Sequence, residues 1–189
     1  QTFVLSSTDS GANWSEPVEI TDGVVAPHMT FYVVGPGHGI QRKDGTLVIP
    51  GDHRSSNRTD EIFVHSHVIY SNDHGASWKL GGVTVGGADE CEVVETRDGQ
   101  LYMAIRGQDR TQDYRFCAWS NDGGLTWSDI EELTELPDPR CQASIVRFTD
   151  RDSHDKDRIL FSNIASSTRD TMTVRVSYDE CRTWATSKV

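Results

Sequence analysis

Three charged residues stand in segments where their side chains could do chemistry. Glu90 lies in the segment DECEVVE, Arg106 near the end of LYMAIRG, and Arg169 in SSTRD. A guanidinium binds a carboxylate through two parallel hydrogen bonds and keeps its charge, and a carboxylate can take a proton from a neighbouring group. These residue types point to recognition of an acidic ligand and to proton transfer. On residue type alone, each of the three also fits an ordinary solvated charge.

The overall charge limits the partners of such a site. The 189 residues include 18 Lys and Arg against 29 Asp and Glu, which gives a net charge of -11. This balance argues against a nucleic-acid partner, because phosphate binding needs a basic face. An acidic ligand is still compatible, since charges are screened over about 8 Å at physiological salt and a local arginine cluster can act against the overall field. No run of 18 apolar residues occurs, so no membrane span is predicted.

The elements that must position these residues read as strands. Around Arg106, alternation places Leu101, Met103 and Ile105 on one face of a strand and Arg106 on the other. KDGTL and RDGQL are typical Asp-Gly hairpin turns, and no helix of any length is predicted. The sequence therefore predicts an all-β chain that forms one domain over residues 1–189. The strand candidates are 2–6, 38–42, 46–50, 62–70, 91–96, 100–105, 114–119, 143–148, 158–162 and 171–177.

An eight-residue pattern, S-x-D-x-G-x-[NST]-W, occurs as STDSGANW, SNDHGASW, SNDGGLTW and, with one departure, SYDECRTW. Its aspartates are Asp9, Asp73, Asp122 and Asp179, at spacings of 64, 49 and 57 residues. Such spacings favour a repeated supersecondary unit, as in a propeller. Ser and Asp side chains can bind the N–H groups of a turn, Gly can take a positive φ, and Trp can pack over the hairpin. A calcium loop needs further oxygens and a terminal Glu, so we interpret these aspartates as structural and predict no metal.

The fourth copy has Cys181 where the other three copies have glycine. A side chain in a positive-φ conformation is strained, so we expect a distorted turn at this position. The other cysteines, Cys91, Cys117 and Cys141, form no CxxC pair with it or with each other, which disfavours a zinc site. Buried free thiols are favoured over a disulfide.

The repeated turns resemble the Asp boxes of the sialidase family, which other propeller proteins also contain. The segments between the turns resemble exo-sialidases more specifically, and they occur in the same order. The resemblance covers essentially the whole chain and implies the middle of a six-bladed β-propeller of sialidase type. This chain would form roughly three to four blades of it, truncated at both ends. The matching segments are GPGHGIQRKDGTLVIPG (35–51), DECEVVE (89–95), LYMAIRG (101–107), DPRCQASI (138–145) and RILFSNIASSTRD (158–170).

The resemblance also implies roles for individual residues. In that family three arginines hold the carboxylate of the substrate, a tyrosine assisted by a glutamate attacks the anomeric carbon, and an aspartate serves as acid and base. Glu90 resembles the assisting glutamate, Arg106 the second arginine and Arg169 the third. Gln142 is similar to a glutamine that often lines the pocket, and hydrogen bonding within a blade is its alternative. The first arginine and the aspartate should lie upstream of residue 1, and the tyrosine beyond Val189.

The implied activity is hydrolysis of terminal α-linked sialic acids from glycoproteins, gangliosides or oligosaccharides, with retention and without a cofactor. A tyrosine nucleophile suits this substrate, because sialic acid carries a carboxylate on the carbon to be attacked and a carboxylate nucleophile would bring two anions together. The fragment by itself should be inactive. An extracellular, cell-surface or lumenal location is favoured.

Two other functions stay open. One is a non-catalytic Asp-box propeller that binds a glycan or a protein, and the other is a different Asp-box glycosidase with a pair of aspartates. The spacing of 16 residues between Glu90 and Arg106 favours the sialidase. Arg175 competes with Arg169 for the role of third arginine. We prefer Arg169, because it lies in a polar loop, where ligand contacts concentrate, whereas Arg175 lies inside the strand-like TMTVRV.

Histidines and a polar segment supply weaker candidates. His65 and His67 share a strand face, but without a third ligand at a useful spacing they predict no metal site. The polar segment GDHRSSNRTDE (51–61) is expected to be a loop at the rim of the site. There His53 or Arg54 could touch the glycerol or acyl group of the sugar.

Overall fold

The computed structural model describes residues 1–55, 63–108 and 112–188 of the chain. In these residues the chain is built of β-strands, with one short helix, α1 (Thr21–Val24), so the all-β prediction is confirmed. None of the described helical residues belongs to a helix long and apolar enough to cross a membrane. The strands are β1 (Phe3–Val4), β2 (Val18–Glu19), β3 (Met29–Val34), β4 (Ile40–Gln41), β5 (Leu47–Ser55), β6 (Val64–Ser71), β7 (Lys79–Val83), β8 (Ala88–Glu95), β9 (Leu101–Gly107), β10 (Tyr114–Ser120), β11 (Glu131–Pro137), β12 (Ser144–Thr149), β13 (Arg158–Ile164), β14 (Met172–Ser177) and β15 (Thr186–Lys188).

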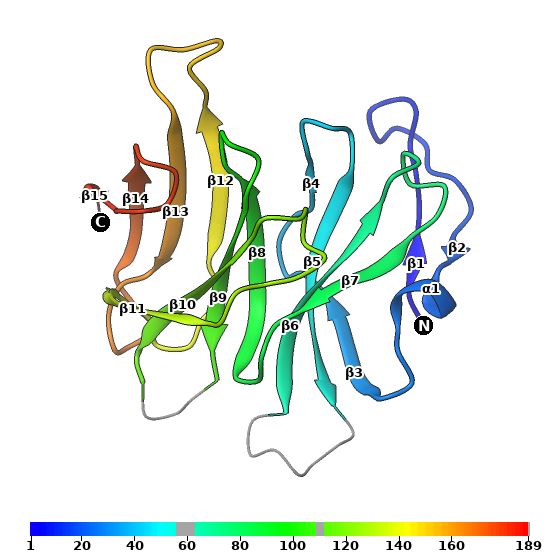
Figure 1. Ribbon diagram of the computed structural model, residues 1–189, viewed down its shortest axis with the longest axis horizontal. Helices are drawn as coiled ribbons and strands as arrows, with labels where there is room; N and C mark the ends of the chain where they lie inside the picture. Colours follow the sequence, from blue (N-terminus) through cyan, green and yellow to red (C-terminus); the bar gives the residue numbers. More distant parts are fainter. Residues whose placement is uncertain (56–62, 109–111, 189) are drawn as a thin grey trace.

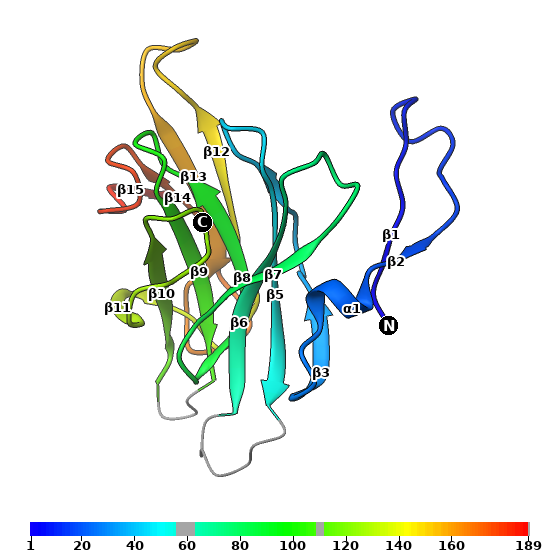
Figure 2. The same cartoon turned by 45° about the vertical axis from the view of Figure 1, so that its right-hand side comes forward.

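Three antiparallel sheets stand side by side in chain order (Figure 1). The first sheet has the order β3-β5-β6-β7, with β4 also paired to β5. The second sheet is β8-β9-β10-β11 and the third is β12-β13-β14-β15. The hairpin β1-β2 lies beside the first sheet and is joined to it through α1 (Figure 2). Three full sheets and a hairpin agree with the predicted three to four blades.

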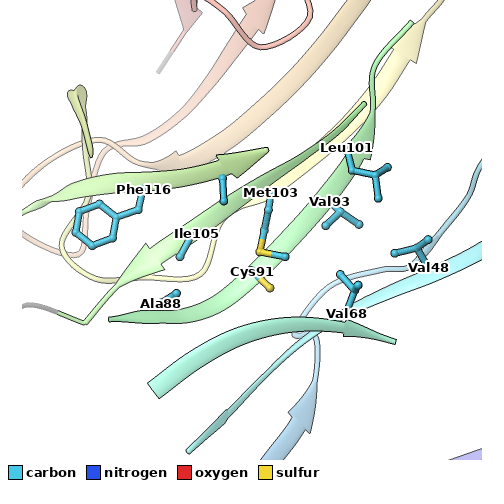
Figure 3. Packing of buried hydrophobic residues seen from close by; sticks show 10 residues of the cluster. Val48, Val68, Ala88, Cys91, Val93, Leu101, Met103, Ile105 and Phe116 are labelled. Atoms are coloured by element: carbon cyan, nitrogen blue, oxygen red, sulfur yellow. The ribbon is translucent and has the colours of Figure 1, made fainter. Parts of the chain in front are cut away.

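Apolar side chains fill the spaces between the sheets. Between the first and second sheets, Val48 and Val68 pack with Cys91, Val93 and other buried residues of β8 and β9 (Figure 3). Burying one such valine stabilises the fold by about 1.5–3 kcal/mol. A second cluster joins the second and third sheets, and its buried members are Val94, Tyr102, Ala104, Cys117, Leu136, Ala143, Ile145, Ile159, Phe161 and Cys181.

Strand β9 contributes to both clusters. Leu101, Met103 and Ile105 belong to the first, while Tyr102 and Ala104 belong to the second. The predicted alternation is therefore correct, but both faces of the strand are buried. A strand between two packed sheets needs apolar residues on both sides, which is why LYMAI reads as an unbroken apolar run.

Several strand boundaries differ from the prediction. Strand β5 continues to Ser55, so Gly51–Ser55, expected in a rim loop, extend the central strand of the first sheet. Residues 56–61 of that expected loop lie outside the described residues. Five strands were not predicted from the sequence: β2, β3, β7, β11 and β15. Most of these lie at a sheet edge, where β11 (EELTELP) exposes charged side chains and its apolar signal is weak.

The four repeated turns share one set of hydrogen bonds. In the third copy, Asp122 Oδ1 accepts bonds from the N–H groups of Leu125 (3.0 Å) and Thr126 (2.9 Å), and Ser120 Oγ accepts one from Gly124 N (2.8 Å). Equivalent bonds surround the aspartates of the other copies, Asp9, Asp73 and Asp179. In Figure 1 the turns lie in the upper half of the molecule, spread along the row of sheets. Each aspartate carboxylate accepts hydrogen bonds from N–H groups of its own turn.

The expected distortion at Cys181 is not observed. Cys181 has φ 68°, close to the values of 86°, 88° and 91° at the equivalent glycines. Its N–H donates to Ser177 Oγ at 2.9 Å, and Thr183 N donates to Asp179 Oδ1 at 2.8 Å, as in the glycine copies. The hydrogen bonds hold the turn in its usual shape, so the strain stays local to the residue. All four cysteines are free thiols, as predicted, and three of them are buried, whereas Cys141 is half-buried.

Candidate functional site

The start of β8 and the end of β9 bring Glu90 and Arg106 together. In the antiparallel register Ala88 pairs with Gly107 and Cys91 with Ile105, and an irregularity falls between these pairs, where Glu90 lies. Such a bulge can re-aim a side chain. Arg106 Nη1 donates a hydrogen bond to Glu90 Oε2 at 2.8 Å. The two residues that the sequence singled out thus form an ion pair.

The guanidinium of Arg106 serves a second carboxylate as well. Its Nη1 lies 3.5 Å from Asp89 Oδ2, and Asp89 also accepts a hydrogen bond from Gln108 Nε2. Burial opposes the charge on Arg106, but the bond to Glu90 and the charges of both carboxylates outweigh it and raise the arginine pKa. Arg106 is therefore held cationic, and its side chain is still 24% exposed.

A cavity of about 460 Å³ opens beside this ion pair. One wall is apolar and comes from β3 and the segment that follows it, while the other walls carry two arginines and three carboxyl groups. The volume lies within the range of small-ligand sites, about 300–1,000 Å³, and an apolar wall with a few polar groups is typical of them. The lining residues are Phe31, Val33, Val34, Pro36, Asp52, Arg54, Asp89, Glu90, Arg106 and Gln108.

Arg169 lies in the connection between β13 and β14, at the lower end of the sheets in Figure 1, where β8 begins and β9 ends. Its side chain is exposed, and Nη2 donates a long hydrogen bond, 3.5 Å, to the carbonyl of Arg140. Arg106 and Arg169 therefore share one end of the molecule, opposite the Asp-box turns. The structure shows Arg169 in contact with Arg140 and not with the Arg106 ion pair.

Gln142 does not line the cavity but contacts Pro36, which does. Its Nε2 donates to the carbonyl of Pro36 (3.2 Å) and to Glu92 Oε1 (3.3 Å). Glu92 is 2% exposed, and its Oε2 also accepts bonds from Ser144 Oγ and from the N–H of Ile145. The amide of Gln142 thus joins the segment after β3, β8 and the start of β12, across sheets rather than within one.

Arg175 occupies a different environment from Arg169. Its side chain is buried, and Nη1 donates to Asn163 Oδ1 at 2.5 Å. The opposite face of β14 carries Met172 and Val174, as the alternation predicted, but these side chains are largely exposed. Arg175 therefore packs inside the sheets and lies away from the cavity.

The histidines form a cluster of their own, on the face of the first sheet away from the cavity. His53 is buried and its Nδ1 lies 3.0 Å from Nδ1 of His67, while its ring stacks on His65 at 5.4 Å between centroids. Of the two rim candidates, Arg54 lines the cavity and His53 does not. Among the described residues no group of three or more His, Cys, Asp or Glu side chains has the arrangement of a metal site.

Asp52 is the cavity residue that the sequence analysis missed. It is 2% exposed, and burial, followed by the nearby charges of Asp89 and Glu90, raises its pKa to about 7. The polar segment GDHR was predicted to be a loop, so the alternation of inward and outward side chains along the preceding strand was not continued into it. Continuing the strand pattern from Val48 through Pro50 would have placed Asp52 on the same face.

Comparison with known proteins identifies relatives over nearly the whole chain. The family described as "BNR repeat-like domain" matches this chain over residues 1–189. A sialidase of Bacteroides fragilis is 34% identical over 188 residues, 98% of this chain and 34% of that protein, and a sialidase of Micromonospora viridifaciens is 34% identical over 98% of this chain and 29% of that protein. The structure of the Hadza microbial sialidase Hz136 superposes with a TM-score of 0.86 at 32% identity, over 99% of this chain and 36% of its own.

These comparisons identify the sheets as part of a sialidase-type β-propeller. The chain spans about a third of the length of these relatives. It is also 33% identical, over 94% of its length and 39% of the relative's, to an exo-alpha-sialidase of Aspergillus fumigatus, and exo-alpha-sialidases are glycoside hydrolases. The chain therefore belongs to the BNR-repeat domains of the sialidase family.

Proposed function

We propose that the protein containing this chain hydrolyses terminal α-linked sialic acids of glycoproteins, gangliosides or oligosaccharides, with retention at the anomeric carbon. The observation that carries this proposal is the ion pair between Arg106 and Glu90 at the mouth of a 460 Å³ cavity. A fixed guanidinium and a carboxylate beside an apolar wall suit a small sugar acid.

Each residue has a role in this proposal. Arg106 binds the carboxylate of the sialic acid, and Arg169, at the same end of the sheets, adds a second guanidinium. Glu90 takes the proton of a tyrosine nucleophile that lies outside residues 1–189, as does the acid/base aspartate. A neutral tyrosine avoids the repulsion that a carboxylate nucleophile would meet at a carbon that already bears a carboxylate.

The ion pair suits both roles. Arg106 Nη1 pairs with Glu90 Oε2 at 2.8 Å, and the carboxylate of Glu90 can accept a proton from a phenol. A bound substrate carboxylate would share the guanidinium of Arg106 with Glu90.

Hydrolysis of a fluorogenic sialoside by the full-length protein tests the proposal. We expect Arg106→Ala to lower kcat/KM by about 100-fold or more, in line with loss of a charge-assisted contact in a desolvated site. Arg151→Ala is the matched control, because Arg151 is an exposed arginine paired with Asp157 at the other end of the sheets. Activity that survives Arg106→Ala would refute the assignment. Binding of sialic acid without any turnover would favour the non-catalytic alternative.

A further inference from the structure

Asp52 is a buried acid on the wall of the cavity. On the central strand β5 it pairs with Val33 of β3 on one side and Ser66 of β6 on the other. Its side chain lines the same cavity as Asp89, Glu90 and Arg106. Its Oδ1 is fully buried and has no hydrogen-bond partner among the described residues. Burying a charged carboxylate without a partner costs much free energy, so an acid in such a position favours the protonated form.

The proton on Asp52 has a structural reason. The carboxyl group of Asp89 is a neighbour of Asp52, and its charge and its ability to accept a hydrogen bond from a protonated Asp52 both raise the pKa of Asp52. Ionised carboxylates only accept hydrogen bonds, so a bond between these two groups requires one proton. Asp89 Oδ2 accepts a hydrogen bond from Gln108 Nε2 and lies 3.5 Å from Arg106 Nη1, so Asp89 already serves as an acceptor, whereas Asp52 Oδ1 is buried without a partner among the described residues. The proton therefore resides on Asp52.

We propose that Asp52 is a positioning residue whose proton keeps the Asp52–Asp89 pair singly charged, so that Arg106 can bind the carboxylate of the ligand. This inference rests on the proposed sialic acid site. Asp52 itself need not touch the reacting atoms. It acts through Asp89, which neighbours Asp52 on one side and faces Arg106 on the other.

The charged groups around Asp52 show what its ionisation would change. Asp89 and Glu90 approach from β8, Arg106 from β9, and Arg54 lies on β5 itself. Strand β3 contributes apolar side chains to this wall. Ser66 of β6, which pairs with Asp52, donates its hydroxyl to the carbonyl of Asp89 at 2.6 Å. With Asp52 protonated, Arg106 faces two carboxylates.

A third negative charge at Asp52 would compete directly with a ligand carboxylate for the same guanidinium. Cys91, which is also near, adds no charge at neutral pH because burial raises the pKa of its thiol to about 12.

The consequence is a linkage between ligand binding and a proton. A ligand that binds only when Asp52 is protonated must bring a proton onto Asp52 wherever the free protein has lost it. The pKa of Asp52 is about 7 in the free protein. Affinity should therefore be constant below this pH and fall above it, by about tenfold between pH 6 and pH 8.

Binding of sialic acid to the full-length protein tests the inference by titration calorimetry at pH 6, 7 and 8. For the wild type we expect the affinity to fall by about tenfold across this range. Buffers of different ionisation enthalpy should show uptake of about 0.9 proton per ligand at pH 8 and about 0.1 at pH 6. Asp52→Asn keeps the shape of the neutral acid and cannot ionise, so its affinity should not change with pH. Asp155→Asn, an exposed carboxyl paired with Arg158, should keep the slope of the wild type.

The outcomes separate this inference from the proposed function. If no variant and no wild-type sample binds sialic acid at pH 6, the proposed function fails and this inference fails with it. If the wild type binds equally well at pH 6 and pH 8 without taking up a proton, the site stands and the role of Asp52 is refuted. If the affinity of Asp52→Asn still falls with pH as in the wild type, the role of Asp52 is refuted as well. The proton-uptake measurement needs only the wild type, so it decides the question even if Asp52→Asn does not fold.

Discussion

The arginines of this chain differ in what holds them, and that difference predicts what each one does. Arg106 is fixed by two carboxylates and lines a cavity. Arg169 is exposed and makes one long bond to a carbonyl. Arg175 is buried and bonded to Asn163. A guanidinium that is exposed and loosely held can bind a ligand, whereas one that satisfies a buried amide supports the fold.

Substitution of the two competing arginines should therefore give opposite results. In the full-length protein, we expect Arg169→Ala to lower kcat/KM for a sialoside by about 100-fold with little change in Tm, because a ligand contact is lost and no buried group is exposed. Arg175→Ala should lower Tm by about 4–8 °C, because Asn163 Oδ1 loses its buried donor. The measurements are steady-state kinetics and thermal unfolding of both variants. Equal loss of activity at equal Tm in the two would contradict the preference for Arg169.

Part of this site is predictable from the sequence, and part is not. Glu90 and Arg106 could be selected because they end apolar strand patterns with residue types suited to an acidic ligand. Asp52 could not be selected in the same way, because GDHR looks polar and its burial depends on β8 packing against β5. The neighbouring carboxyl groups of Asp52 and Asp89 belong to residues 37 positions apart in different sheets. No local pattern contains that contact.

At the scale of elements, each of the three sheets carries an Asp-box turn, and the first and second sheets contribute the residues that line the site. The turn uses two successive residues with positive φ, such as His74 and Gly75, and Cys181 shows that a side chain is tolerated in the second position. The Asp-box turns could be predicted from the sequence, because each turn is stabilised by contacts within eight residues. Among the described strands, the missed strand β11 pairs with β10 alone at the edge of its sheet, and its exposed charged side chains weaken the apolar pattern.

An Asp-box aspartate should matter for stability and not for catalysis. In the full-length protein we expect Asp122→Ala to lower Tm by about 3–6 °C, because the N–H groups of Leu125 and Thr126 and the hydroxyl of Thr126 lose their acceptor. The value of kcat/KM below the transition should stay within about twofold. Thermal unfolding and sialoside hydrolysis measure the two effects.

Asp129→Ala serves as the matched control for the Asp-box prediction, since Asp129 is an exposed aspartate just after the same turn. It should leave Tm nearly unchanged. A loss of activity without a loss of stability in Asp122→Ala would show that this aspartate belongs to a functional site.

At the scale of the whole molecule, the sheets bury one face against a neighbour and expose the other where no further sheet covers it. On the third sheet, Ile145 and Phe161 are buried against the second sheet. The opposite face presents four apolar side chains with exposed fractions between 42% and 62%: Val146, Phe148, Met172 and Val174. The register of β12, β13 and β14 places these side chains on one face of the sheet. A contiguous apolar face of this kind is a site of association.

The 189-residue chain expressed alone should therefore self-associate. We expect aggregates or higher oligomers at micromolar concentration in size-exclusion chromatography with light scattering, because the open face of the third sheet remains in water. The triple variant Phe148→Lys, Met172→Lys and Val174→Lys should shift the chain towards the monomer. A control with the same added charge at exposed polar or small positions, Thr8→Lys, Ala76→Lys and Ser153→Lys, separates removal of the apolar face from a general gain in solubility. A wild-type chain that stays monomeric and unfolds in one cooperative transition would show that this face needs no cover.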